Sequence, residues 1–138
     1  MKHMYSAGII VYRLVKKEVQ YLLLQYNARH WDFSKGGIEP NETKEDAALR
    51  ELQEEAGISA SIDPGFEETF SYIFHDQDKK LAHKTVYFFV GQATSCEVAL
   101  SHEHINYAWL SYNKAYEILT YDNAKHALSK AHDFIGHR

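Results

Sequence analysis

Residues 36–58, GGIEPNETKEDAALRELQEEAGI, decide the fold of this chain. Within them, Glu51, Glu54 and Glu55 crowd three carboxylates into five positions. On an α-helix these positions share one face, where like charges destabilise the helix by ~0.2–0.5 kcal/mol per pair. A solvated, glutamate-rich helix face is one interpretation. A hard divalent cation such as Mg²⁺ explains the cluster better, because it takes oxygen ligands and commonly bridges carboxylates to substrate phosphates.

The helix that carries these carboxylates is predicted over Thr43–Ala56. Thr43 is a suitable N-cap residue, and Gly57 stands where a left-handed C-cap belongs. Ala48 and Leu52 belong to an apolar stripe beside the carboxylates, and this stripe can pack on a sheet. The glutamates are therefore expected to lie next to the buried face of the helix.

The rest of the chain mixes strands and helices without strict alternation, and Gly36 to Asn41 reads as a loop. No repeat, low-complexity tract or linker divides the chain, so a single domain over residues 1–138 is expected. Its predicted class is α/β (α+β), with an α/β/α sandwich around a central mixed sheet. The predicted strands are Ala7–Leu14, Val19–Tyr26, Phe66–His75, Lys84–Gly91 and Ile105–Leu110, with a short extended piece at His30–Phe33; the further helices are Tyr112–Leu119 and Asn123–Phe134.

Composition narrows the functional classes. The chain has 138 residues with 45% hydrophobic and 25% charged side chains, as expected for a globular protein. Its net charge of −4 disfavours broad nucleic-acid affinity. The apolar run Ala7–Tyr12 is too short to span a membrane and no secretory signal precedes it. The single cysteine, Cys96, fits a reducing cytoplasm.

The spacing of the acidic stretch follows a longer pattern. Gly36 is followed at fixed intervals by Glu42, Arg50-Glu51-Leu52, Glu54-Glu55 and Gly57-Ile58. These residues match every fixed position of the Nudix box, G-x5-E-x7-R-E-U-x-E-E-x-G-U, where U is aliphatic. The chain resembles the Nudix hydrolases, which implies a Nudix fold and hydrolysis of a nucleoside diphosphate linked to another group.

The resemblance also implies roles inside the box. Glu51, Glu54 and Glu55 look like the metal ligands of the family, with Glu42 as a weaker candidate acting through water. Arg50 is placed to tie the helix to the preceding loop through its planar donor fork, and pairing with Glu54 is compatible with that role. Bound metal ions would polarise the bridging phosphate and activate the attacking water.

Two flanking segments extend the resemblance over nearly the whole chain. HWDFSKGGIEPNE leads into the helix, and LSHEHINYAWL lies far downstream. Together they resemble the asymmetrical diadenosine tetraphosphate hydrolases. Two positions depart from that group, because many members carry proline where this chain has Ser34 and histidine where it has Gly37. These departures bear on the substrate more than on the chemistry.

The same resemblance suggests further site residues. Glu103 resembles the acidic loop residue that binds a metal or activates water, so the implied catalytic set is Glu51, Glu54, Glu103 and Arg50. His104 is expected to be structural or to face phosphate. Candidate substrate contacts are His30, Lys35, Gly36 and Lys84 for phosphate, with Tyr72 and Tyr121 as an adenine clamp. For Lys84 a strand-end charge, and for each tyrosine a place in the half-buried core, are the alternatives.

The expected function is Mg²⁺-dependent hydrolysis of diadenosine tetraphosphate to ATP and AMP by a metal-activated water, with Mn²⁺ able to substitute. Within the family, removal of pyrophosphate from RNA 5′-triphosphate ends and nucleoside triphosphate pyrophosphatase activity are the alternatives. A non-catalytic nucleotide sensor is the alternative from another class, although such modules usually lose box glutamates and none is lost here. The expected partner is a small nucleotide, with no membrane, and the expected form is a monomer.

Overall fold

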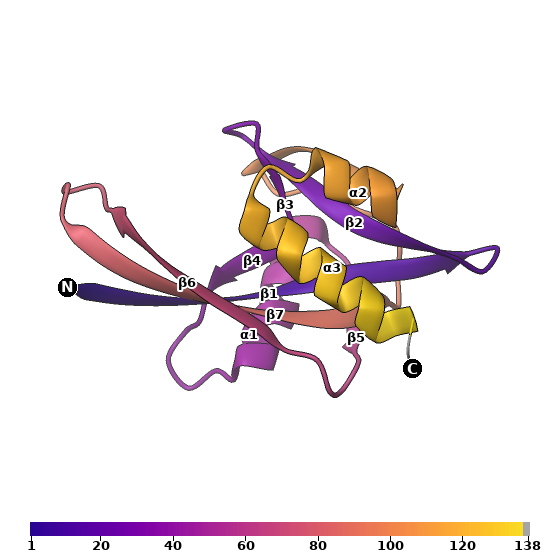
Figure 1. The fold of residues 1–138 in the computed structure, drawn as a ribbon, viewed down its shortest axis with the longest axis horizontal. Coiled ribbons are helices and arrows are strands. Elements are labelled where there is room, and N and C mark those ends of the chain that lie inside the picture. The colour runs from indigo at the N-terminus through magenta and orange to yellow at the C-terminus, as the bar shows by residue number, and fades with distance from the viewer. Residues whose placement is uncertain (137–138) are drawn as a thin grey trace.

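The computed structural model describes residues 1–136, which form one mixed β-sheet with helices on both faces (Figure 1). The last two residues of the expected 1–138 domain lie outside the described part. The strands are β1 Lys2–Val15, β2 Glu18–Tyr26, β3 Trp31–Asp32, β4 Ser34–Gly37, β5 Ala60–Ile62, β6 Glu68–His75, β7 Leu81–Ala93 and β8 His104–Ser111. The helices are α1 Lys44–Ala56, α2 Tyr112–Ile118 and α3 Asp122–Gly136.

Strand β1 organises the sheet. It pairs in parallel with β7, from Lys2 opposite Ala82 to Tyr12 opposite Gln92. On its other edge it pairs antiparallel with β2 and with the short strand β4. Strands β5 and β6 pair with β7, and β8 pairs with β2. The sheet is therefore mixed, as the sequence predicted.

The two faces of the sheet carry separate hydrophobic clusters. Ala48 and Leu52 of α1 are fully buried in one cluster, together with Ile9 of β1. Ala127 and Leu128 of α3 are fully buried in the other. In Figure 1, α3 crosses in front of the sheet and α1 lies behind it. This layering confirms the predicted α/β/α arrangement.

The predicted helix and its caps are confirmed. The Thr43 side chain accepts a hydrogen bond from the backbone N–H of Asp46 at 3.0 Å. Gly57 adopts the left-handed conformation with φ 70°, and its N–H donates to the carbonyl of Gln53. Both ends of α1 thus satisfy backbone groups that a helix cannot pair internally.

Two local predictions were wrong. Gly36 and Gly37 were expected in a loop, but they belong to β4, which pairs with Ser6–Ile9 of β1. Strand β5 was not predicted, because its three residues are too few to show a period. The remaining strands and helices lie where the sequence placed them, with β1 and β7 extending several residues further.

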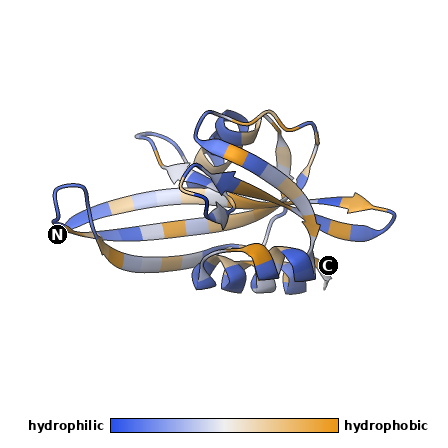
Figure 2. Ribbon diagram, turned by 90° about the horizontal axis from the view of Figure 1, so that it is seen from above, coloured by the Kyte–Doolittle hydropathy of each residue, from blue (hydrophilic) through white to orange (hydrophobic). Residues whose placement is uncertain are grey.

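One end of the sheet projects beyond the helices. The start of β1 and the hairpin of β6 and β7 form this extension, and the turn between β6 and β7 is hydrophilic (Figure 2). Over residues 1–136, no helix has both the length and the apolar character needed to cross a bilayer.

Candidate active site

Arg50 contacts several carboxylates of the Nudix-box segment, and the glutamates around it are here called the acidic wall. Its Nε and Nη2 donate to the two carboxylate oxygens of Glu42 at 2.7 and 3.0 Å. Its Nη1 donates to Glu51 at 3.0 Å and to Glu54 at 3.1 Å. Nη2 also donates to the carbonyl of Gly37 at 2.9 Å, which ties α1 to β4 as the sequence predicted. The planar guanidinium thus holds three carboxylates in a fixed geometry.

These contacts change the interpretation of Glu42. Both of its oxygens face Arg50, and one also accepts from the backbone N–H of Glu39 at 3.0 Å. The bond from Arg50 lowers the pKa of Glu42, so its carboxylate stays ionised. Glu42 therefore positions Arg50, and in this arrangement it is poorly placed to bind a cation.

Glu55 is the buried member of the wall, with 6% of its surface exposed. It accepts a hydrogen bond from the backbone N–H of Lys35 at 3.2 Å. Burial, reinforced by the nearby carboxylate of Glu51, raises the pKa of Glu55 to about 8. Burial also raises the pKa of Glu51, against the opposing influence of Arg50. The protein thus holds carboxylates close together where water cannot screen them.

Gly36 makes room for this wall. A Cβ atom built on Gly36 would collide with the carboxylate of Glu51, whereas one built on Gly37 meets nothing within 4 Å. Gly36 has no positive φ, so its conformation does not require glycine. The box glycine is therefore needed here for the space beside Glu51.

The Ser101–His104 loop lies at the same cavity as the glutamates of α1. The backbone N–H of Ser101 donates to the carbonyl of Glu55 at 3.0 Å, at the end of α1. His104 is buried, its Nδ1 lies 3.0 Å from the Ser101 hydroxyl, and burial lowers its pKa. These contacts favour a structural role for His104. Glu103 has an exposed side chain on the same loop.

The four candidate metal ligands, Glu51, Glu54, Glu55 and Glu103, line one cavity of about 690 Å³, here called the acidic cavity. Across residues 1–136, no three acidic, histidine or cysteine side chains already converge on a common point. The donor set nevertheless fits a hard divalent cation, because it consists of carboxylate oxygens whose crowding a cation would relieve. Burial is the main cause of the raised pKa of Glu55, and the nearby carboxylates of Glu51 and Glu103 raise it further.

A second cavity of about 460 Å³, here called the aromatic cavity, holds the predicted base-binding residues. His30, Tyr72 and Tyr121 line it from the β2–β3 turn, from β6 and from the residue before α3. The rings of His30 and Tyr121 lie 5.5 Å apart. Tyr121 is 49% exposed, so it is not core packing. The structure brings together side chains that are about ninety residues apart in sequence.

Lys35 and Lys84 line both cavities. Lys35 pairs with the buried carboxylate of Asp32 at 3.0 Å. Lys84 has no ion pair among the described residues, and burial lowers its pKa, with a further contribution from Lys35. Lys35 and Lys84, here called the cationic wall, therefore lie between the aromatic and the acidic cavity, although the net charge of the chain is negative.

Comparison with known proteins decides the family. The family model described as NUDIX domain matches residues 2–131. The chain belongs to the Nudix family. It is a Nudix hydrolase with all box glutamates in place, and Nudix hydrolases generally act with divalent metal ions.

Within the Nudix family, the chain is similar to curated asymmetrical bis(5′-nucleosyl)-tetraphosphatases. It is 34% identical to the protein of Sus scrofa and 32% identical to that of Caenorhabditis elegans. These alignments cover 94% of this chain and 94% and 95% of the relatives. The solved structure of a C. elegans Ap4A hydrolase binary complex superposes with a TM-score of 0.86 at 30% identity, covering 98% of this chain and 99% of that one.

Sequence reasoning missed two residues of this Nudix site. Asp32 is 2% exposed and holds Lys35, and a carboxylate between Trp31 and Phe33 could have signalled a buried ion pair. Asn27 bonds to the loop of Glu103, and nothing in the sequence marks it. The partner of Asp32 is only three residues away, whereas the fold alone brings Asn27 to its partners.

Proposed function

We propose that this Nudix hydrolase cleaves diadenosine tetraphosphate to ATP and AMP with Mg²⁺. The observation that carries the proposal is the cationic wall shared by the acidic and aromatic cavities. A substrate with a base at one end and a long polyphosphate beside it matches this arrangement, with the base in the aromatic cavity and the polyphosphate along the lysines and into the acidic cavity. The named activity of the similar pig and nematode proteins supports the same substrate class.

The base is assigned to the aromatic cavity. Tyr72 and Tyr121 offer ring faces, and neither hydroxyl has a hydrogen-bond partner among the described residues. Stacking on aromatic rings is worth ~1–3 kcal/mol per base and needs no hydroxyl. His30, whose ring lies 5.5 Å from Tyr121, completes this part of the site.

The polyphosphate is assigned to the cationic wall and the acidic cavity. Lys84 is the stronger phosphate contact, because its ammonium forms no ion pair with any residue from 1 to 136, while Lys35 is paired with Asp32. Gly36 lies on the wall of the acidic cavity and exposes its backbone there. A desolvated ammonium gains more from a phosphate than an exposed one, because water screens it less.

The acidic cavity is assigned to the chemistry. Glu51, Glu54, Glu55 and Glu103 would hold the cation, and Arg50 orients the first two. The bound cation supplies charge neutralisation of the phosphates and lowers the pKa of the attacking water. Hydrolysis adds water across one phosphoanhydride bond, so its oxygen goes to one product and ATP and AMP form in equal amounts.

The remaining expectations belong to the same proposal. We take residues 1–138 as one catalytic domain that acts as a monomer on a small nucleotide. A reducing cytoplasm fits its lone, exposed Cys96. The net charge of −4 disfavours the RNA 5′-end activity, because RNA binding favours a basic protein.

A substrate panel tests the proposal. Diadenosine tetraphosphate, ATP, GTP and 5′-triphosphorylated RNA are each incubated with enzyme and Mg²⁺ in water enriched in oxygen-18. The expected result is equal ATP and AMP from the first substrate, with the label in one of them, and no turnover after chelation. The product that carries the label identifies the phosphorus attacked. Faster release of pyrophosphate from RNA or from a nucleoside triphosphate would overturn the substrate assignment.

A further inference from the structure

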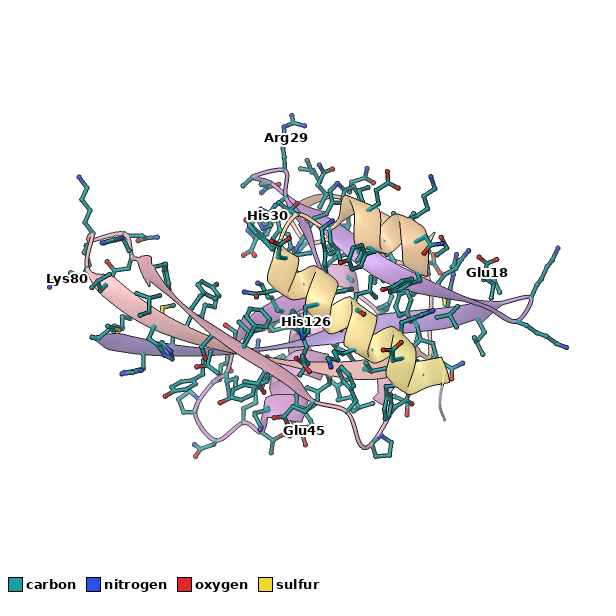
Figure 3. The ribbon with its side chains drawn as sticks, viewed as in Figure 1. Glu18, Arg29, His30, Glu45, Lys80 and His126 are labelled. Atoms are coloured by element: carbon teal, nitrogen blue, oxygen red, sulfur yellow. The ribbon has the colours of Figure 1, made fainter. Side chains whose placement is uncertain are left out.

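The turn after β2 lies between the two cavities. The ladder between β2 and β8 shifts register between Gln25 and Tyr26, and such a bulge re-aims the residues that follow. The N–H of Tyr26 donates to the carbonyl of His30 at 2.9 Å. The N–H of Arg29 donates to the carbonyl of Tyr26 at 2.7 Å. Arg29 points away from the body, while His30 lies at the start of α3 (Figure 3).

Asn27, within this turn, bonds twice to the loop that carries Glu103. Its backbone N–H donates to the carbonyl of Glu103 at 3.0 Å. Its side-chain Nδ2 donates to the carbonyl of His102 at 2.9 Å. Asn27 therefore contacts two consecutive peptide groups next to the candidate metal ligand.

The other side of the loop is fixed to α1. The carbonyls of Glu55 and Ala56, at the end of the helix, accept from the N–H groups of Ser101 and Ala99 at 3.0 and 2.8 Å. The carboxylate of Glu103 itself has no hydrogen bond or ion pair to any described residue. Its position over the acidic cavity therefore depends on the backbone on either side of it.

We infer that Asn27 is a positioning residue that holds Glu103 over the acidic cavity. This inference rests on the proposed role of Glu103. The helix end fixes the loop before Glu103, and Asn27 fixes it at Glu103 and His102. Without the side-chain bond, Asn27 holds this loop only through its backbone bond to the carbonyl of Glu103, so the carboxylate samples a wider range of positions. Small displacements of a catalytic group reduce turnover more than substrate binding.

Three variants isolate the side-chain bond. Asn27→Ala removes it, and Asn27→Asp replaces the donor with an ionised oxygen that faces the carbonyl of His102. Gln25→Ala is the matched control, because Gln25 makes the same kind of bond, from Nε2 to the carbonyl of Arg29 at 3.1 Å, within its own turn. A hydrogen bond of this kind has a net worth corresponding to about 2- to 10-fold in rate. Both Asn27 variants should lose that much kcat with KM unchanged, and Gln25→Ala should keep wild-type turnover.

Hydrogen exchange of the metal-free protein provides a readout independent of activity. The amides of Ala99 to His104 should exchange faster in both Asn27 variants than in the wild type, and at the wild-type rate in Gln25→Ala. Unchanged exchange in this loop would overturn the inference. Faster exchange throughout the chain would also overturn it, since it would indicate a general loss of stability.

A double-mutant cycle with Glu103→Gln separates this inference from the proposed function. If Asn27 acts through Glu103, then Asn27→Ala should cause no further loss of kcat in the Glu103→Gln protein. Losses that multiply would overturn the inference and leave the role of Glu103 standing. Wild-type turnover in Glu103→Gln alone would overturn both the catalytic role of Glu103 and the inference built on it.

Discussion

The acidic and aromatic cavities differ in how the chain builds them. Three of the four candidate metal ligands come from one helix, and Gly36 and Arg50 from the same stretch lie beside them. The aromatic cavity instead collects residues from a turn, from the four strands β3, β4, β6 and β7, and from the start of α3. The first therefore has a sequence pattern that can be recognised locally, and the second becomes visible only when the sheet has formed.

The difference also separates two kinds of energy. The acidic cavity holds a buried carboxylate, Glu55, at a cost that its raised pKa shows, and in the proposed function this cavity stabilises charge that changes during the reaction. In the proposed function, the ring faces of the aromatic cavity stack on a base equally before and during the reaction. Changes in the first should act on kcat and changes in the second on KM.

The largest effect is expected from Glu55→Gln in the acidic cavity. The substitution keeps the shape of the buried side chain but removes its charge. Loss of charge stabilisation at such a site costs ~10²-fold or more in kcat. Steady-state kinetics at saturating Mg²⁺ measure it. Glu45→Gln, on the exposed first turn of the same helix, is the control that should retain full turnover (Figure 3). Near-normal turnover in Glu55→Gln would remove the residue from the metal site.

A neighbouring pair of glycines tests whether space beside Glu51 matters. Gly36→Ala places a methyl group against the Glu51 carboxylate, whereas Gly37→Ala enters open space. Displacing a catalytic carboxylate by about 1 Å can cost ~10²-fold, so Gly36→Ala should lose between about 10- and 100-fold in kcat. Gly37→Ala should stay close to wild type. Equal losses in the two variants would mean that flexibility of β4, rather than the room for Glu51, is what the glycine supplies.

Alanine at the tyrosines probes the aromatic cavity. Tyr72→Ala and Tyr121→Ala should each raise KM with little change in kcat. Loss of stacking worth ~1–3 kcal/mol corresponds to about 5- to 150-fold in affinity. Phenylalanine at either position should restore binding, because the ring face makes the contact. A KM that stays constant in the alanine variants, with circular dichroism intact, would place the base elsewhere.

The smallest effect concerns pH and the metal-free fold. Glu55 has its pKa raised from 4.5 to about 8, so between these values the folded protein holds a proton that the unfolded chain has released. Stability without metal should therefore fall as pH rises from 4.5 to 8. Urea unfolding at several pH values measures this slope, which Glu55→Gln should flatten. The apparent affinity for Mg²⁺ should rise by up to about 10-fold per pH unit over the same window, since the cation displaces that proton. If the free energy of unfolding depends on pH in Glu55→Gln as it does in the wild type, another titratable group causes that dependence.

The sequence predicted the features that depend on local spacing and missed those that depend on contacts between distant elements. The helix, its caps and the shared face of Glu51, Glu54 and Glu55 follow from local spacing, which the fold preserves. The need for glycine at position 36 could not be predicted from the sequence, because it depends on how closely Gly36 of β4 approaches Glu51 of α1. Asn27 could not be found, since its two partners lie some seventy-five residues away and its own neighbours carry no pattern.

Strand β1 gives this site an order of assembly. Lys35 lies opposite Gly8 on one edge of β1, and Lys84 lies opposite Met4 on the other. The second pairing joins residues from the two halves of the chain, and such long-range parallel contacts form late, because a long loop must close first. During synthesis, the Nudix box and its helix emerge well before β7. Because Lys84 belongs to β7, the cationic wall proposed to bind the polyphosphate can form only after the ribosome has released this strand.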